Sequence, residues 1–540
     1  MNKSVLILGA GLMQGPAIRA AKELGYTAFV VDGNPGAVCA SMADVFNVID
    51  LKDRQALADY ADLINKNASE GKNGELAAVF TAGTDFSASV AYVAEHCSLP
   101  GHSFEACLNA SNKVRMRGCF AAGKVPSPDF EEVDSEKIQE LILRAEKNQI
   151  SFPKVIKPVD NMGGRGCRLV RNKDELQEAV TLAVKNSRTS KAIFEDYMDG
   201  QEFSIDSIVY DGTLTITGFA DRHIYYPPYF IETGHTMPST VSEKVKNELI
   251  ATFALGIKSL GLQRGVAKAD IKYTARGPMI GEIAARLSGG YMSGWTFPYS
   301  SDCYLTKEAL KVSLGVAPDF IEKNRVSIKW QPHQSVKDME QPFELYELKP
   351  SKVSAERAWI SIPGKIKAIS GYEEAEAVKY VKDVLPRNKE GDQVNFPRNN
   401  VEKCGNVITC AQTHELAVSA ACEVLSKITL RLEPHNKDTE DFLKGVEAPD
   451  EKCFPPSAFD VEVNWNKVKD IPQGQKISLF IPQEFTEKVL EKRDWNHCTL
   501  KQVISRFENM CPDHKPLEGK TFWKACLRGS IQAMLYIADN

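Results

Sequence analysis

The chain has 540 residues, 43% of them hydrophobic and 25% charged, which is the composition of a folded protein with roughly three or four domains. Its 66 basic and 71 acidic residues give a net charge of -5, so no overall positive field exists to attract nucleic acid or an anionic membrane. The 13 cysteines contain no CxxC pair and predict neither a zinc site nor a disulfide framework, which favours a reducing, cytoplasmic location.

The first hundred residues alternate short hydrophobic segments with helical patterns. This alternation predicts a parallel sheet with helices on its faces. A signal peptide is the weaker reading of the N-terminus, because glycines interrupt the apolar run, and no later run reaches the ~18 residues of a membrane span. We therefore expect a soluble protein. The expected elements are strands at 5–8, 27–32 and 76–80 and helices at 14–24 and 85–96.

A glycine-rich turn joins the first strand to the first helix. Gly9 and Gly11 begin a near match to GxGxxG, and Asp32 closes the second strand, as in dinucleotide-binding folds. The third glycine comes one place late, however, because Gln14 stands where it should be. A tight strand-to-helix turn also requires glycine. We favour the tight turn and keep a nicotinamide oxidoreductase as the alternative.

From Lys154 onward the pattern becomes rich in strands. The dipeptide Asp211-Gly212 separates two alternating segments and predicts a hairpin, because both turn positions favour positive φ. A helix with a cap at Ser239 or Ser242 and a stop at Gly261 follows. The expected ranges are strands at 155–158, 193–198, 202–210 and 213–220, the helix at 241–260, and a second hairpin of strands at 266–274 and 278–286.

The last two regions carry weaker patterns. Mixed strands and a helix at 414–425 are expected between Val326 and Pro434. From His435 a polar, acidic stretch through Pro455-Pro456 predicts a linker, and a final helix is expected at 522–538. The fold class is thus α/β and α+β with an additional C-terminal domain.

The second hairpin brings two carboxylates together. If residues 275–277 form a three-residue turn, the predicted pairs are Asp270 with Glu282, Lys272 with Ile280 and Lys268 with Ala284. Directly opposed carboxylates lie roughly 4.5 to 5.5 Å apart at Cβ and repel unless a cation lies between them. Such oxygen ligands suit Mg²⁺ completed by substrate phosphates and water. The alternative is a solvated pair balanced by Lys268, Lys272 and Arg286.

Three upstream segments add groups that suit a nucleotide. Lys157 precedes the loop 161–167, whose glycines allow backbone amides to converge on an anion, although a glycine-rich hairpin without a ligand is the alternative. Glu195 to Met198 end an apolar strand that can present backbone groups to an adenine edge, and Glu202 can reach a ribose hydroxyl.

Together and in this order, these motifs resemble the ATP-grasp superfamily. The resemblance is strongest to the carboxylate-amine ligase branch of the L-amino acid ligases, and more distant to carbamoyl phosphate synthase and biotin carboxylase. It covers about residues 1–435. The matching segments are 111–113, 155–158, 163–166, 195–202, 269–270 and 281–290. The implied domains are a Rossmann-like pre-ATP-grasp domain (1–110), the two-lobed ATP-grasp domain (111–325), the C-terminal part of the ligase core (326–434), and a linker with a small domain of unknown role (435–540).

Carried over residue by residue, the resemblance implies ATP and Mg²⁺, or Mn²⁺, as cofactors. The implied ATP ligands are Lys113, Lys157, Gly163, Gly164, Gly166, Glu195, Tyr197, Met198 and Glu202. The implied metal ligands are Asp270 and Glu282, and Arg286, Gly289 and Gly290 would meet the acyl phosphate or substrate carboxylate. Residues 232–235 resemble a substrate-capping loop, with Glu232 facing substrate and His235 near the transferred phosphate. A packed core histidine is the alternative for His235.

The resemblance implies that ATP activates a carboxylate as an acyl phosphate, which an amine then attacks, releasing phosphate as well as ADP. The implied partners are a small carboxylic acid and an amine, without nucleic acid or membrane. The resemblance also suggests a homodimer, because many enzymes of this superfamily look dimeric. One departure is Ala284, where many members have Asn, and it implies weaker occupancy of a second metal. The alternatives are activation of bicarbonate or formate, and a non-catalytic ATP-binding regulator.

Overall fold

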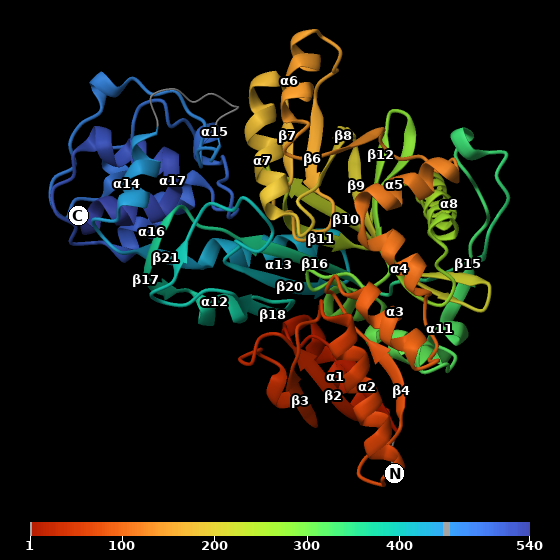
Figure 1. Cartoon of the computed structure of the whole chain (residues 1–540). Coiled ribbons are helices and arrows are strands. Elements are labelled where there is room, and N and C mark those ends of the chain that lie inside the picture. The colour runs from red at the N-terminus through yellow and green to blue at the C-terminus, as the bar shows by residue number, and fades with distance from the viewer. Residues whose placement is uncertain (1–2, 446–453) are drawn as a thin grey trace. The chain divides into compact units, whose positions relative to one another are not determined.

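The computed structural model describes residues 3–445 and 454–540, and the chain divides into two compact units (Figure 1). The first unit contains residues up to 223 and residues 235–354, and the second contains residues 224–234 and those from 355 onward. The domain boundaries expected at residues 110, 325 and 434 stay predictions, because this division follows other residues.

The first unit begins with a parallel four-stranded sheet in the order β3-β2-β1-β4. Its two central strands are almost wholly buried, as expected for a parallel sheet covered by helices. The predicted strands and helices are confirmed, whereas β3, α2, α4 and α5 are not predicted by the sequence pattern. The bounds are β1 (Ser4–Leu8), α1 (Gly15–Glu23), β2 (Thr27–Asp32), β3 (Val45–Val48), α2 (Arg54–Ser69), β4 (Leu76–Phe80), α3 (Ser87–His96), α4 (Phe104–Ser111) and α5 (Lys113–Ala122).

The glycine-rich turn after β1 is filled by the chain's own side chains. The Gln14 amide bonds to both backbone groups of Ala82, and its Oε1 accepts from the Ala82 amide at 3.0 Å. A Cβ added to Gly9 would lie 3.2 Å from Gln14 Cγ. Asp32 accepts from the Ala10 amide at 2.8 Å. These contacts support the tight-turn reading of the motif.

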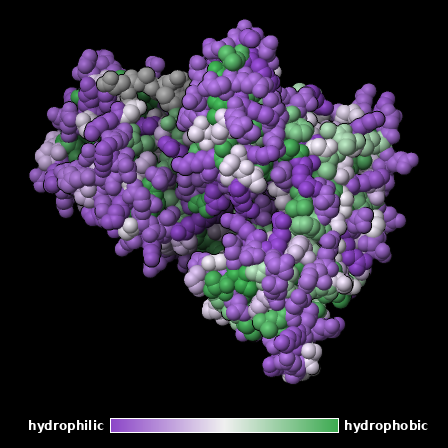
Figure 2. All heavy atoms as spheres, in the orientation of Figure 1, coloured by the Kyte–Doolittle hydropathy of each residue, from purple (hydrophilic) through white to green (hydrophobic). Residues whose placement is uncertain are grey.

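Strand β3 is the exposed edge of this sheet. Its Val45 and Val48 are 37% and 56% exposed, and Figure 2 shows hydrophobic residues gathered over α1 and β3. An edge strand that is exposed on its faces lacks the periodicity of a buried strand, which explains why the sequence pattern did not reveal it.

A second, antiparallel sheet follows in the order β5-β8-β6-β7. Helices α6 and α7 lie side by side against it and close a small hydrophobic core with its strands (Figure 1). The bounds are β5 (Phe130–Val133), α6 (Ile138–Glu146), β6 (Lys154–Pro158), β7 (Arg168–Val170), α7 (Leu176–Asn186) and β8 (Ala192–Asp196).

The rest of the first unit is built on long antiparallel strands in the order β13-β12-β9-β10, packed against helix α8. The Asp211-Gly212 hairpin is confirmed, since Tyr210 pairs with Thr213 and both turn residues have positive φ. Helix α8 begins after its Ser242 cap and ends at Gly261, as predicted. The bounds are β9 (Gln201–Tyr210), β10 (Thr213–Tyr225), α8 (Glu243–Leu260), β12 (Gly265–Thr274), β13 (Gly277–Ala284), α9 (Phe297–Ser301), α10 (Leu305–Ser313), α11 (Asp319–Asn324), β14 (Arg325–Ser327) and β15 (Glu344–Leu348), and β11 (Ile231–Met237) has residues in both units.

The register of the β12–β13 hairpin is confirmed near the carboxylates and wrong near the turn. Asp270 pairs with Glu282 and Lys268 with Ala284, but Lys272 pairs with Met279 instead of Ile280. The turn is one residue tighter than predicted, because Thr274 pairs with Gly277, and an irregularity at Gly281 restores the register beyond it.

The second unit contains the three-stranded sheet β19-β17-β21, the neighbouring strands β16, β20 and β18, and several helices. Helix α13 is confirmed and α17 extends the predicted final helix at both ends. The prediction of a linker after His435 is partly wrong, because residues 437–444 form helix α14. Residues 446–453 of the predicted linker lie outside the described residues. The bounds are β16 (Val353–Trp359), β17 (Gly364–Ser370), α12 (Tyr372–Glu376), β18 (Val381–Pro386), β19 (Gln393–Val394), β20 (Gly405–Ala411), α13 (His414–Lys427), β21 (Thr429–Leu432), α14 (Lys437–Lys444), α15 (Glu487–Leu490), α16 (Leu500–Met510) and α17 (Gly519–Asp539).

Candidate functional site

The two predicted metal ligands lie opposite each other on neighbouring strands, Asp270 on β12 and Glu282 on β13. Lys268 Nζ lies 2.5 Å from Asp270 Oδ2, and Lys113 Nζ lies 3.9 Å from Glu282 Oε2. Burial raises the pKa of Glu282, but Lys113 and Lys268 outweigh this effect and lower the pKa below its ordinary value. Glu282 is therefore a carboxylate anion at neutral pH.

An arginine that sequence reasoning missed links the predicted metal and ribose residues. Arg222 on β10 places Nη1 2.8 Å from Asp270 Oδ2 and 2.6 Å from Glu202 Oε1. Lys272 Nζ lies 3.3 Å from the other Glu202 oxygen and donates to the Met198 carbonyl at 3.2 Å. The carboxylates of this face are thus joined to one another through cations.

The two predicted phosphate lysines occupy the same region. Lys113, at the start of α5, donates from Nζ to the Asn161 carbonyl at 3.0 Å, at the beginning of the glycine loop. Lys157 Nζ lies 2.8 Å from Glu195 Oε2. Lysine ammonium groups beside a glycine loop are typical of a site for a polyphosphate.

The Glu195 carboxylate has a different setting from the predicted adenine contact. It is 1% exposed, and Arg117 Nε lies 2.8 Å from its second oxygen. Because one oxygen faces the buried Arg117 and the other faces the partly buried Lys157, this side chain orients both cations. The contact predicted for the backbone of Tyr197 and Met198 stays a prediction.

The loop 161–167 needs its glycines. Gly163, Gly164 and Gly166 have φ of 69°, 73° and 70°, and a Cβ on Gly166 would lie 2.8 Å from Asn186 Cβ. Cys167 follows them, and burial raises the pKa of its thiol despite the nearby lysines. The loop therefore offers a close backbone approach and no reactive thiolate.

Arg286 lies against the loop that follows β4. Its Nε lies 3.7 Å from Asp85 Oδ1, in the loop after β4. The predicted Gly289 packs against the same loop, since a Cβ there would lie 3.2 Å from the Gly83 carbonyl oxygen, and Gly290 has φ of 61°. Arg286 and Gly289 thus both lie against the loop after β4, and the contact predicted for Arg286 and the two glycines with the substrate stays a prediction.

A buried aspartate, Asp206, holds the backbone next to Arg286 and the two glycines. Asp206 on β9 accepts from the Ser288 amide at 3.2 Å and from the Ser288 hydroxyl. Burial raises the pKa of Asp206 to about 7. Asp206 and Asp85 belong to no sequence motif, so sequence reasoning had no signal for them. Arg117 could have been found, because it stands one helical turn after Lys113 and this spacing places both on one helix face.

The two predicted residues of the capping loop belong to different units. Glu232 is in the second unit, where its amide donates to Asn400 Oδ1 and its carbonyl accepts from Lys403 Nζ, both at 2.8 Å. His235 is in the first unit and is fully buried. The roles predicted for Glu232 and His235 at the substrate stay predictions.

Comparison with known proteins identifies two parts of the chain. Residues 150–294 match the family described as ATP-grasp domain, and residues 358–433 match L-amino acid ligase C-terminal domain 2. The chain contains an ATP-grasp domain. The first match includes the glycine loop, both carboxylates and Arg286, so the resemblance inferred from the motifs is confirmed, and so is the expected fold class.

Individual relatives are distant. The chain is 26% identical over 231 residues to the uncharacterised protein y4rH of Sinorhizobium fredii, covering 42% of this chain and 47% of that one. It is 23% identical over 336 residues to carnosine synthase 1 of Gallus gallus, covering 59% of this chain and 36% of that one. It therefore spans less than half the length of either relative.

A solved structure shares the fold of most of the chain. The L-amino acid ligase from Bacillus licheniformis superposes with a TM-score of 0.64 at 18% identity, covering 80% of this chain and 99% of that one. Within residues 3–445 and 454–540, every cysteine is a free thiol, and no helix is both long and apolar enough to cross a bilayer.

Proposed function

We propose that the chain is an ATP- and Mg²⁺-dependent carboxylate-amine ligase that forms an amide or peptide bond between small molecules. The observation that supports this most is the opposed pair Asp270 and Glu282, inside an ATP-grasp domain and next to Lys113 and Lys157. The match of residues 358–433 to a ligase C-terminal domain adds to it.

The donor set fits Mg²⁺. Two carboxylates face each other, and Glu282 is ionised at neutral pH. In the described part of the chain no group of three or more His, Cys, Asp or Glu side chains is placed to hold a metal, so phosphates and water would complete the shell, as Mg²⁺ prefers. When bound by Asp270 and Glu282, the metal would neutralise phosphate charge. The side chain of Ala284 offers no oxygen to a second ion.

The protein's own groups would align the reactants. Lys113, Lys157 and the amides of the glycine loop hold the phosphates, while Arg286 holds the carboxylate of the acid. A carboxylate oxygen attacks the γ-phosphorus, the bond to ADP breaks, and the amine nitrogen then displaces phosphate from the acyl phosphate while losing a proton. Alignment and charge neutralisation supply most of the catalysis in such phosphoryl transfers. Residues 224–234 would exclude water, which otherwise hydrolyses the acyl phosphate.

The test is release of ADP and phosphate by the purified protein with Mg-ATP and pools of small carboxylic acids, each with and without pools of amines. We expect release that depends on one acid pool and increases with one amine pool. Release with bicarbonate or formate alone would replace the proposed acid. ATP binding without release in any mixture would contradict the proposal and favour a regulatory protein.

A further inference from the structure

The capping segment, residues 224–234, belongs to the second unit although the residues on both sides of it belong to the first. Two residues before it stands Arg222, whose guanidinium contacts Asp270. One residue after it stands the buried His235. The position of this segment is therefore decided by what holds it within the second unit.

Five aromatic side chains, which we term the aromatic cluster, hold it there. Phe396 is the centre, with ring centroids 5.3 Å from Tyr226, 5.5 Å from Phe454 and 5.1 Å from Trp495. Tyr229 meets Phe454 at 4.7 Å. All four contacts are edge-to-face, the geometry that stabilises aromatic pairs beyond the area that they bury.

The backbone of the capping segment depends on these contacts. Tyr226 has φ of 66°, and an aromatic residue takes up this left-handed conformation only where its surroundings hold it. The next anchor is Glu232, which is held through its backbone by Asn400 and Lys403. Ring contacts thus fix one part of the segment and hydrogen bonds fix another.

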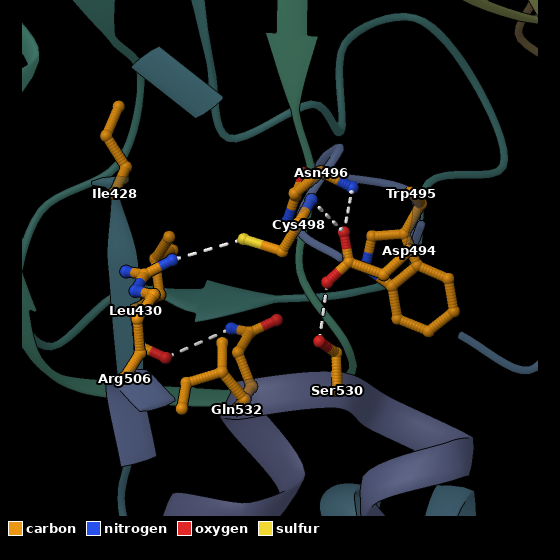
Figure 3. Close-up of a pocket in the computed structure, with 10 residues that line it drawn as sticks. Ile428, Leu430, Asp494, Trp495, Asn496, Cys498, Arg506, Ser530 and Gln532 are labelled. Carbon is orange, nitrogen blue, oxygen red and sulfur yellow. Dashed lines mark hydrogen bonds between the residues drawn. The ribbon is translucent and has the colours of Figure 1, made fainter. Parts of the chain in front are cut away.

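Trp495 stands on a rigid loop. Asp494 accepts from the Asn496 and Cys498 amides at 2.9 Å and from the Ser530 hydroxyl at 2.5 Å (Figure 3). The Asn496 side chain also bonds to both backbone groups of Ile360, at 2.9 and 3.0 Å. The small pocket in Figure 3 is lined by polar groups that bond to one another, so we assign it to support of this loop.

Two of the five rings come from a part of the chain outside the two family matches. The match to the L-amino acid ligase C-terminal domain ends at residue 433, whereas Phe454 and Trp495 belong to the C-terminal segment, residues 454–540. The Bacillus licheniformis ligase is covered over 99% of its length by 80% of this chain. The C-terminal segment therefore has contacts of its own with the capping segment.

We propose that the C-terminal segment, through Trp495 and Phe454, positions the capping segment for the carboxylic acid or amine substrate. This inference rests on the proposed ligase function. Trp495 and Phe454 are positioning residues. Trp495 acts through Phe396 on Tyr226, and Phe454 acts on Tyr229 directly, so both influence the backbone that carries Glu232. Without the two rings, the segment samples more conformations and binds the substrate less tightly, while ATP binding is unchanged.

The experiment compares Trp495→Ala, Trp495→Phe and Trp465→Ala with the wild-type full-length chain. Trp465 is the matched control, since both tryptophans are partly buried against the same hydrophobic core but Trp465 lies outside the aromatic cluster. Amide hydrogen exchange of peptides within 224–234 is measured first. We expect Trp495→Ala to speed it about fivefold or more, and Trp495→Phe and Trp465→Ala to leave it near wild type.

Kinetics supply the second readout. Trp495→Ala should raise the KM for the acid or amine about tenfold with the KM for ATP unchanged, and Trp495→Phe should restore it. Wild-type exchange rates in Trp495→Ala would overturn the inference. If that variant does not fold, Phe454→Ala decides by the same two criteria. Failure of the ligase proposal is distinguishable, because it would abolish turnover in the wild type and leave the exchange result intact.

Discussion

At the scale of single residues, two arginines that belong to no sequence motif pair with the predicted carboxylates of the site. Glu195 lies between Arg117 and Lys157, and Arg222 lies between Asp270 and Glu202. The sequence motifs predicted Glu195, Lys157, Asp270 and Glu202 as site residues, but neither of the two arginines. A partner contributed by another strand depends on tertiary contacts, which a single sequence does not display.

Glu195→Gln tests whether this carboxylate orients the phosphate lysine. Removing the charge leaves Arg117 and Lys157 uncompensated in a buried setting, which we expect to lower the free energy of unfolding by about 3 to 5 kcal/mol. Urea unfolding measures the change, and the KM for ATP should rise with it. Glu178→Gln is the control, because that carboxylate is 70% exposed beside Arg168 and should cost under about 1 kcal/mol. Equal losses in both variants would contradict the assignment.

His102 predicts a pH dependence of stability. Its Nδ1 accepts from the Gln263 and Arg264 amides at 3.2 Å, and its Nε2 donates to the Val266 carbonyl at 3.0 Å, so it is neutral. Burial lowers its pKa to about 4 from the model-peptide value of 6.5. Between pH 6.5 and 4, His102 is therefore protonated in the unfolded chain but not in the folded chain. The free energy of unfolding should fall as the pH drops from about 6.5 toward 4.

The free energy of unfolding measured by urea at several pH values checks this expectation. His102 contributes a slope of up to about 1.4 kcal/mol per pH unit inside that window. His102→Gln retains a donor and an acceptor but does not titrate. Above pH 7 the free energy of unfolding should therefore change with pH in the same way in wild type and variant. An identical slope in both proteins between pH 4 and 6.5 would show that other groups carry it.

At the scale of elements, hairpin geometry decided what could be predicted. The Asp211-Gly212 turn has positive φ at both positions and was recognisable from two residues. The β12–β13 register was recognisable at Asp270 and Glu282 because the tighter turn and the irregularity at Gly281 compensate each other. Lys272 lies between the turn and the irregularity, so the prediction that it pairs with Ile280 was wrong.

The glycine loop gives a prediction with an internal control. Gly166 and Gly212 have φ of 70° and 74°, but a Cβ on Gly166 would lie 2.8 Å from Asn186 Cβ, whereas a Cβ on Gly212 would meet nothing within 4 Å. Gly212→Ala should cost about 1 kcal/mol of stability through its backbone alone. Gly166→Ala should cost more and raise the KM for ATP, which Gly212→Ala should not. Equal effects of the two substitutions on the KM for ATP would contradict the assignment of the glycine loop to the phosphate site.

At the scale of the whole molecule, the fold class was predictable while the division into units was not. Alternating patterns revealed the N-terminal sheet and the long hairpins, since each follows from local periodicity. The transfer of residues 224–234 to the second unit follows from side-chain packing around Phe396. The same packing gives a role to the C-terminal segment, in which no sequence motif was found.

The account depends most on Glu282 as a ligand of the reacting nucleotide's metal. The decisive measurement is acid-dependent ADP release by Glu282→Gln, compared with wild type and with the exposed Glu178→Gln. We expect Glu282→Gln to lose at least about a hundredfold in kcat/KM, or about 2.7 kcal/mol, because it removes one of two opposed carboxylates, and Glu178→Gln to match wild type. Full turnover in Glu282→Gln would contradict the proposed ligase site.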